Sequence, residues 1–206
     1  MSAAREALAR SLRALLDGLG ATGAPDAELA ALTAQIDAAS ERFARTRRER
    51  PASAALAGMG DFAERGPICG RANPIAPPAE LAPDRSAQTV RGSVTFGDAF
   101  EGAPGIVHGG FVAAVLDEAL GMVAALPGTP AMTGELKVRF KRPTPTRTRL
   151  EIRAQVDEAR GRRVLVSGEL LAGGLVTAAA TGLFVAVGSA KFDELDGIRR
   201  ERQPAG

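Results

Sequence analysis

The chain has 206 residues and a formal net charge of only +2, so it carries no charge excess of the kind that attracts polyanions. It contains eight Phe but no Trp or Tyr, which argues against the aromatic platforms that bind single-stranded nucleic acid. With one Cys and one His, an intramolecular disulfide is excluded and a zinc site is disfavoured. Hydrophobic residues make up 45% of the chain, which is enough for a sizeable core.

Neither the N-terminus nor any apolar run indicates export or membrane insertion. The first residues, 1–6, lack the uninterrupted apolar core of a signal peptide. The longest apolar run, 111–126, is too short to span a bilayer and contains Asp117 and Glu118. We therefore expect a cytoplasmic protein without a membrane span.

The first 50 residues are predicted to form a helical extension. Leucines recur at helical spacing over residues 3–18, glycines interrupt this pattern, and Pro25 suits the first turn of a second helix that ends near Arg50. Residues 51–87 are rich in Pro, Gly and Ala, and we expect an extended lead-in without much regular structure.

From residue 88 the pattern changes to alternation between apolar and polar residues, which is typical of strands. Strands are predicted over 88–96, 136–141, 150–156, 162–171 and 175–187, with a helix over 110–126. The glycine pair at 173–174 predicts a tight hairpin, and the polar residues 191–206 are expected to form a tail.

This order of elements predicts an α+β fold with an antiparallel sheet in residues 88–190. The helix is apolar almost all round, so it has to be covered on most sides. A curved sheet wrapped around one central helix satisfies both conditions.

The two sides of this central helix differ in the size of their residues. A helical wheel places Gly110, Ala114, Gly121 and Ala124 on or near the side of Asp117, and Val112, Val115, Met122 and Leu126 opposite. The bulky side is expected to pack on the sheet. A side lined with small residues allows a ligand or another helix to approach closely.

The helix also carries the groups that acyl transfer needs. Backbone N–H groups at Gly109 and Gly110 would stabilise an oxyanion, and Asp117 could activate water or attack the acyl carbon. His108 is expected to orient the turn or donate to the carbonyl, and Thr133 to position water or the carboxylate.

Asp117 lies about 10 Å along the helix axis from Gly110, too far to serve the same bound atom. An antiparallel helix from a second subunit would bring its own Asp117 to the start of this helix. We therefore predict a homo-oligomer with the active site shared across a two-fold interface.

Five motifs together resemble hotdog-fold acyl-CoA thioesterases, in particular the PaaI-like branch with its mammalian thioesterase-superfamily relatives. The motifs are Asn73-Pro74-Ile75, Phe100-Glu101-Gly102-Ala103-Pro104-Gly105, Val107-His108-Gly109-Gly110, Leu116-Asp117-Glu118 and Lys141-Arg142-Pro143. The match covers residues 60–188 and leaves the first 50 residues outside it.

The resemblance implies an acyl-CoA substrate, no cofactor other than the coenzyme A of the substrate, no metal, and a dimer or dimer of dimers. It assigns carbonyl polarisation to the glycines after His108, catalysis to Asp117 and assistance to Thr133. Lys141 and Arg142 become contacts for coenzyme A phosphates. Some bacterial members carry an Asn six residues before the His, where this chain has Gly102. The orienting role of that Asn is therefore either absent here or supplied elsewhere, with Asn73 as the candidate.

Two other functions remain open at this point. A non-catalytic acyl-CoA or lipid-binding module of the same fold would have no need of Asp117. A hotdog hydratase is disfavoured because its Asp and His lie a few residues apart, whereas here Asp117 follows His108 by nine positions and the chain has no other His. Glu118 is expected to be structural, and Cys69 to be an inert thiol.

Overall fold

A computed structural model describes residues 3–46, 64–77, 79–128 and 130–187. Its helices are α1 (Ala3–Leu19), α2 (Asp26–Arg45), the 3-10 helix η2 (Asp98–Phe100) and α4 (Gly109–Ala124). Its strands are β1 (Glu80–Asp84), β2 (Thr89–Thr95), β3 (Ala131–Phe140), β4 (Arg149–Arg160), β5 (Arg163–Ala172) and β6 (Leu175–Ala186).

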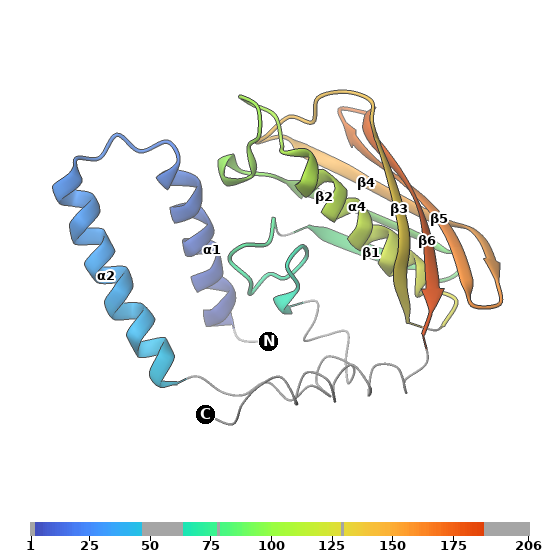
Figure 1. The fold of residues 1–206 in the computed structure, drawn as a ribbon, viewed down its shortest axis with the longest axis horizontal. Coiled ribbons are helices and arrows are strands. Elements are labelled where there is room, and N and C mark those ends of the chain that lie inside the picture. The colour runs from blue at the N-terminus through green and yellow to red at the C-terminus, as the bar shows by residue number, and fades with distance from the viewer. Residues whose placement is uncertain (1–2, 47–63, 78, 129, 188–206) are drawn as a thin grey trace.

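The six strands form one antiparallel sheet in the order β1-β2-β4-β5-β6-β3. The sheet curves around α4, which contacts all six strands (Figure 1). This is the hotdog fold that the sequence predicts. Because β3 lies at one edge of the sheet, its outer backbone groups are open to pairing with another strand.

Burial of the bulky side of α4 explains why the sheet closes over it. Val112, Val115 and Leu120 are fully buried and belong to the same cluster as Ile152 and Phe184 of the sheet. Such burial contributes roughly 1.5–3 kcal/mol for each large side chain. The wheel prediction is wrong at Ala124, which is 1% exposed although it was assigned to the open side. The sheet wraps further around the end of the helix than a two-sided wheel allows.

A strand forms where the sequence analysis predicts no regular structure. Residues 80–84 form β1, which pairs with β2 in the register Leu81 to Gly92 and Pro83 to Val90. Only Leu81 gives this strand an apolar character, and Pro83 is tolerated because β1 is an edge strand. Residues 51–63 of the expected lead-in and the expected tail, 191–206, lie outside the described residues.

The two predicted N-terminal helices are present, and they differ in their position. Helix α1 lies beside the rest of the fold, whereas α2 lies on the side of α1 that faces away from the sheet (Figure 1). Helix α1 contacts η2, and α2 has no buried residue. None of the described helices is both long and apolar enough to cross a membrane.

Candidate functional site

The first turn of α4 is capped by His108, the only histidine of the chain. Its Nδ1 accepts a hydrogen bond from the Gly110 N–H at 3.1 Å, so the ring carries its proton on Nε2 in this arrangement. Within the described residues the Gly109 N–H has no hydrogen-bond partner. The start of α4 therefore holds one satisfied and one available donor.

Close packing around this turn leaves little room for a side chain at either glycine. A Cβ on Gly110 would lie 3.1 Å from Nδ1 of His108, and a Cβ on Gly109 would lie 3.2 Å from the ring of Phe140. Phe140 is the last residue of β3. The pair therefore lets an imidazole and an aromatic ring approach the helix start on two sides.

Asp117 is half-buried on α4 and pairs with Thr133 of β3. The Thr133 hydroxyl donates a hydrogen bond of 3.0 Å to Oδ1 of Asp117. The structure thus brings two predicted site residues together, in the arrangement in which Thr133 positions the carboxylate. Since β3 is an edge strand, this pair lies beside the open edge of the sheet.

Glu118 lies next to Asp117 in sequence, but its carboxyl group lies beside Cys69. Burial, with the negative charge of Asp117 in addition, raises the pKa of Glu118. Burial and the Glu118 carboxylate raise the pKa of the Cys69 thiol to about 12. Cys69 is therefore a protonated, unreactive thiol at neutral pH, as the sequence analysis expects.

The remaining predicted substrate contacts have partners within the chain. The Asn73 side-chain amide donates to the Arg65 and Gly66 carbonyls, and its oxygen accepts from the Ile75 N–H. Lys141 pairs with Glu169 at 3.7 Å. Arg142 donates to the Val176 carbonyl at 2.9 Å. None of these three side chains lines the cavity that opens beside His108 and Gly110 at the start of α4.

A cavity of about 1050 Å³ opens beside His108 and Gly110. Its walls are the first helix, residues 67–75, the segment from the end of β2 to η2, and the first turns of α4. Examples of its lining are Ala14, Ile68, Phe100, Phe111 and Ala114. The sequence places only Ala114 of these residues on a face that a ligand could approach, because an apolar helix face is equally typical of core packing.

These elements combine backbone donors, a positioned carboxylate and an apolar cavity. In the described part of the chain, no three His, Cys, Asp or Glu side chains gather in a way that could hold a metal ion.

The comparison with protein families matches residues 104–179 to the thioesterase superfamily. The acyl-coenzyme A thioesterase THEM4 of Bos taurus is 36% identical over 91 residues, which cover 43% of this chain and 37% of the relative. The chain thus spans little more than a third of that relative's length.

Solved structures agree with the sequence match. A crystal structure of a thioesterase superfamily protein has a TM-score of 0.78 and 29% identity, and the match covers 88% of this chain and 94% of that one. A Streptococcus mutans protein bound to acetyl CoA shares the fold, with a TM-score of 0.51, 17% identity, and coverage of 53% and 89%. Residues 104–179, which include His108, Asp117 and Thr133, therefore match the thioesterase superfamily, and the fold is similar to that of a solved member of it.

Proposed function

We propose that the protein hydrolyses an acyl-CoA thioester to the free acid and coenzyme A. The observation that carries this proposal is the hydrogen bond between Thr133 and Asp117. This hydrogen bond holds a carboxylate at the open edge of the sheet, in a fold in which the first turn of α4 offers a backbone donor. The acyl-coenzyme A thioesterases among the relatives support the same activity.

In the proposed mechanism the substrate carbonyl lies at the start of α4. There the Gly109 N–H polarises it, together with the Gly110 N–H when His108 releases that group. Charge that develops on the carbonyl oxygen is stabilised by these donors and by the positive end of the helix. The proton on Nε2 of His108 is a further donor.

Asp117 acts on the acyl carbon from the opposite side. As a base, it takes a proton from water while the water oxygen bonds to the carbon. As a nucleophile, it forms an acyl-carboxylate intermediate that water then cleaves. In the base route the carbon–sulfur bond then breaks and the Asp117 carboxyl group passes its proton to the coenzyme A sulfur. In the nucleophile route coenzyme A leaves as a thiolate, and the water that cleaves the anhydride supplies the proton that this thiolate takes up.

The proposed active unit contains two copies of the chain. The position of Asp117, about 10 Å along α4 from Gly110, keeps it away from a carbonyl bound at its own helix start. Its location beside the edge strand β3 suits a second copy that adds along this edge. The partner subunit would then supply the carboxylate to each site.

Replacing Asp117 with Asn tests the activity directly. We expect kcat to fall by about 10²–10⁴-fold, because a general base or nucleophile is lost. Release of coenzyme A thiol measures turnover, and calorimetry with the same acyl-CoA measures binding, which we expect to persist.

The matched control is Glu118→Gln, which removes the neighbouring carboxylate on the same helix turn. Its kcat should stay within about threefold of the parent value, since Glu118 lies beside Cys69. Hydrolysis by the Asn variant at the parent rate would refute the mechanism. Binding without hydrolysis by the parent chain would favour the alternative, a non-catalytic acyl-CoA-binding module.

A further inference from the structure

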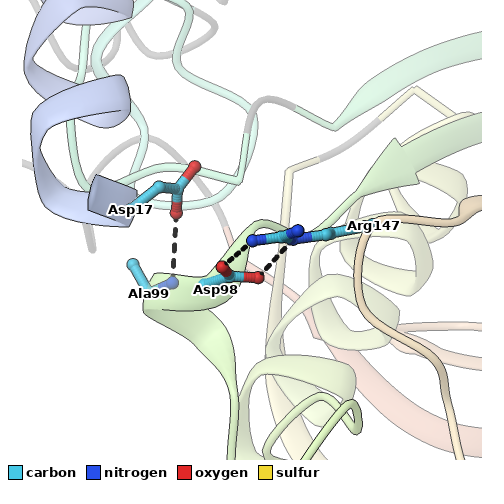
Figure 2. A network of polar contacts seen from close by, with 4 residues as sticks. All are labelled: Asp17, Asp98, Ala99 and Arg147. Atoms are coloured by element: carbon cyan, nitrogen blue, oxygen red, sulfur yellow. Dashed lines mark hydrogen bonds and ion pairs between the residues drawn. The ribbon is translucent and has the colours of Figure 1, made fainter. Parts of the chain in front are cut away.

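Helix α1 is attached to the hotdog region at two polar points. Near its C-terminal end, Asp17 accepts a hydrogen bond of 3.0 Å from the Ala99 N–H in η2 (Figure 2). One turn earlier, the Arg13 guanidinium donates to the Asn73 carbonyl at 2.8 Å and to the Arg71 carbonyl at 3.3 Å. These bonds connect α1 to both segments that border the cavity.

The η2 segment that binds Asp17 is itself held in place by an ion pair. Arg147 pairs with the Asp98 carboxylate next to Ala99 (Figure 2), and this pairing lowers the pKa of Asp98. A Cβ on Gly97 would overlap the Asp17 carboxylate. The absence of a side chain at residue 97 therefore creates the space in which Asp17 sits.

The attached face of α1 is one wall of the cavity beside His108 and Gly110. Arg10, Arg13, Ala14 and Asp17 recur at helical spacing on this face and line the cavity. Opposite them, the rings of Phe100 and Phe111 meet edge to face at a centroid distance of 4.9 Å. Ala14 is the small apolar residue between the polar attachments.

The chemistry of the cavity suits an acyl chain better than the coenzyme A moiety. Its lining is mainly apolar, and Leu16 and Ile75 leave 43% and 61% of their surface exposed there. Of its polar side chains, Arg13 and Asp17 are engaged in holding α1. The remaining polar lining residues are Arg10, Thr95 and His108. They are too few for the several amides and phosphates of coenzyme A, whereas an alkyl chain would cover exposed apolar surface.

We propose that α1 is the wall of the acyl pocket that sets which thioesters are accepted, and that the substrates carry extended aliphatic acyl groups. The inference rests on the proposed function for the thioester itself. The volume of about 1050 Å³ is at the upper end of the range of small-molecule pockets, roughly 300–1,000 Å³. It leaves room for an acyl group well beyond acetyl, with its carbonyl at the start of α4 and its tail toward Ala14.

Ala14→Leu fills this pocket from the α1 side and provides the test. The measured quantity is the ratio of kcat/KM for dodecanoyl-CoA to kcat/KM for butanoyl-CoA. We expect this ratio to fall at least about tenfold, because added methylenes exclude the tail of the longer chain. Ala4→Leu, the same substitution at an exposed position of α1 away from the cavity, should leave the ratio at the parent value.

A second pair of variants weakens the attachment of α1 at Asp17, with no more than one methyl group added to the pocket lining. Gly97→Ala displaces the Asp17 carboxylate, and Asp17→Ala removes the acceptor of the Ala99 N–H. Both should also lower the dodecanoyl-to-butanoyl ratio at least about tenfold, because the tail loses its apolar contact with α1. Circular dichroism verifies that the variants remain folded.

The outcome can be separated from that of the proposed function. Calorimetry with dodecanoyl-CoA in an Asp117→Asn background measures acyl binding without turnover, and Ala14→Leu should weaken it at least about tenfold. If the parent hydrolyses acyl-CoA but Ala14→Leu leaves the ratio unchanged, the pocket assignment is wrong and the activity stands. An equal loss for both substrates would place the coenzyme A moiety in the cavity and overturn the inference. Weakened binding in a chain without hydrolysis would support the pocket and refute the activity.

Discussion

His108 contacts the turn that the sequence predicts it to orient. A lone histidine beside two glycines predicts a residue that orients the turn or donates to the substrate. In the structure the Gly110 N–H donates a hydrogen bond to Nδ1 of His108, so the imidazole acts first as a helix cap. Any donation to a substrate falls to Nε2. The tautomer depends on a backbone contact that no sequence pattern specifies.

Thr133 is predicted to be a positioning residue for Asp117. Thr133→Val keeps the shape of the side chain and removes the hydroxyl that donates to the carboxylate. A hydrogen bond to a charged group is worth about 1.5–3 kcal/mol, so kcat should fall roughly 10- to 100-fold. We expect KM to change by less than about threefold, since the carboxylate acts after binding. Steady-state kinetics with one acyl-CoA measure both values.

The conservative control is Thr133→Ser, which retains the hydroxyl and should restore most of the lost kcat. A Val variant with normal kcat, or a Ser variant as slow as Val, would show that the hydrogen bond to Asp117 does not serve catalysis.

The pairing of Thr133 with Asp117 was within reach of sequence reasoning, whereas the engagement of Asn73 was not. Thr133 lies near the start of β3, next to α4, so a short list of partners is available to it. Asn73 lies in an irregular segment, and its amide bonds to Arg65 and Gly66 follow from a turn without periodicity. Periodic patterns predict which face a residue occupies, and irregular turns leave this open.

At the scale of elements, α4 carries two adjacent carboxylates into different surroundings. Asp117 meets β3, whereas Glu118 turns toward the segment with Cys69. Successive residues point about 100° apart on a helix. Asp117 therefore lies beside the edge strand, whereas Glu118, one residue later, lies beside Cys69. This geometry suits the sequence-based assignment of catalysis to the first and structure to the second.

The half-buried position of Glu118 beside Cys69 predicts a pH dependence of stability. Its pKa is raised in the folded state by burial and by Asp117, so the folded chain binds this proton more tightly than the unfolded chain. The stabilisation of the folded chain by this proton is fully present below the ordinary Glu pKa of about 4.3. It is lost as the pH rises through the raised pKa of Glu118. Urea unfolding of the parent and of Glu118→Gln across this range measures the effect.

Relative to the Gln variant, the parent should lose stability as the pH increases above about 4.3. A constant difference between the two chains over the whole range would mean that Glu118 titrates alike in both states.

The elements with strong periodicity were predictable and the short edge strand was not. Helix α4 and strands β2, β4, β5 and β6 agree with the expected ranges to within a few residues, because each buries a continuous apolar face. β3 begins at Ala131, ahead of the expected residue 136, since its first residues pair with the end of β6. β1 depends on its pairing with β2, and this tertiary contact has no local signal.

At the scale of the whole molecule, the sheet ends in an edge strand that carries exposed apolar side chains. Met132 and Phe140 of β3 are 42% and 56% exposed, although each flanks a predicted site residue. An uncovered edge of this kind is a template for another strand. The proposed two-fold assembly covers it and brings the Asp117 of one copy toward the α4 start of the other.

Mixing two inactive variants tests this assembly. Asp117→Asn lacks the carboxylate, and Gly110→Val blocks the helix start beside His108. In a mixed dimer one site receives both intact halves and the other neither, so random pairing should restore about a quarter of the parent activity. Subunit exchange is verified by mass spectrometry of the native complexes. Exchange without recovery would show that each site is contained within one subunit.

The contact between Asp17 and Ala99 joins positions 82 residues apart in the chain. During synthesis from the N-terminus, α1 is complete long before its docking surface exists. Helix α1 therefore cannot dock until β2 and η2 have formed. Closing this long loop costs chain entropy, which contacts with the assembled hotdog region have to offset. The wall facing the start of α4 is accordingly one of the last features to form. On the proposed assignment of the pocket, we expect a newly made chain to acquire its folded sheet before it can select among acyl groups.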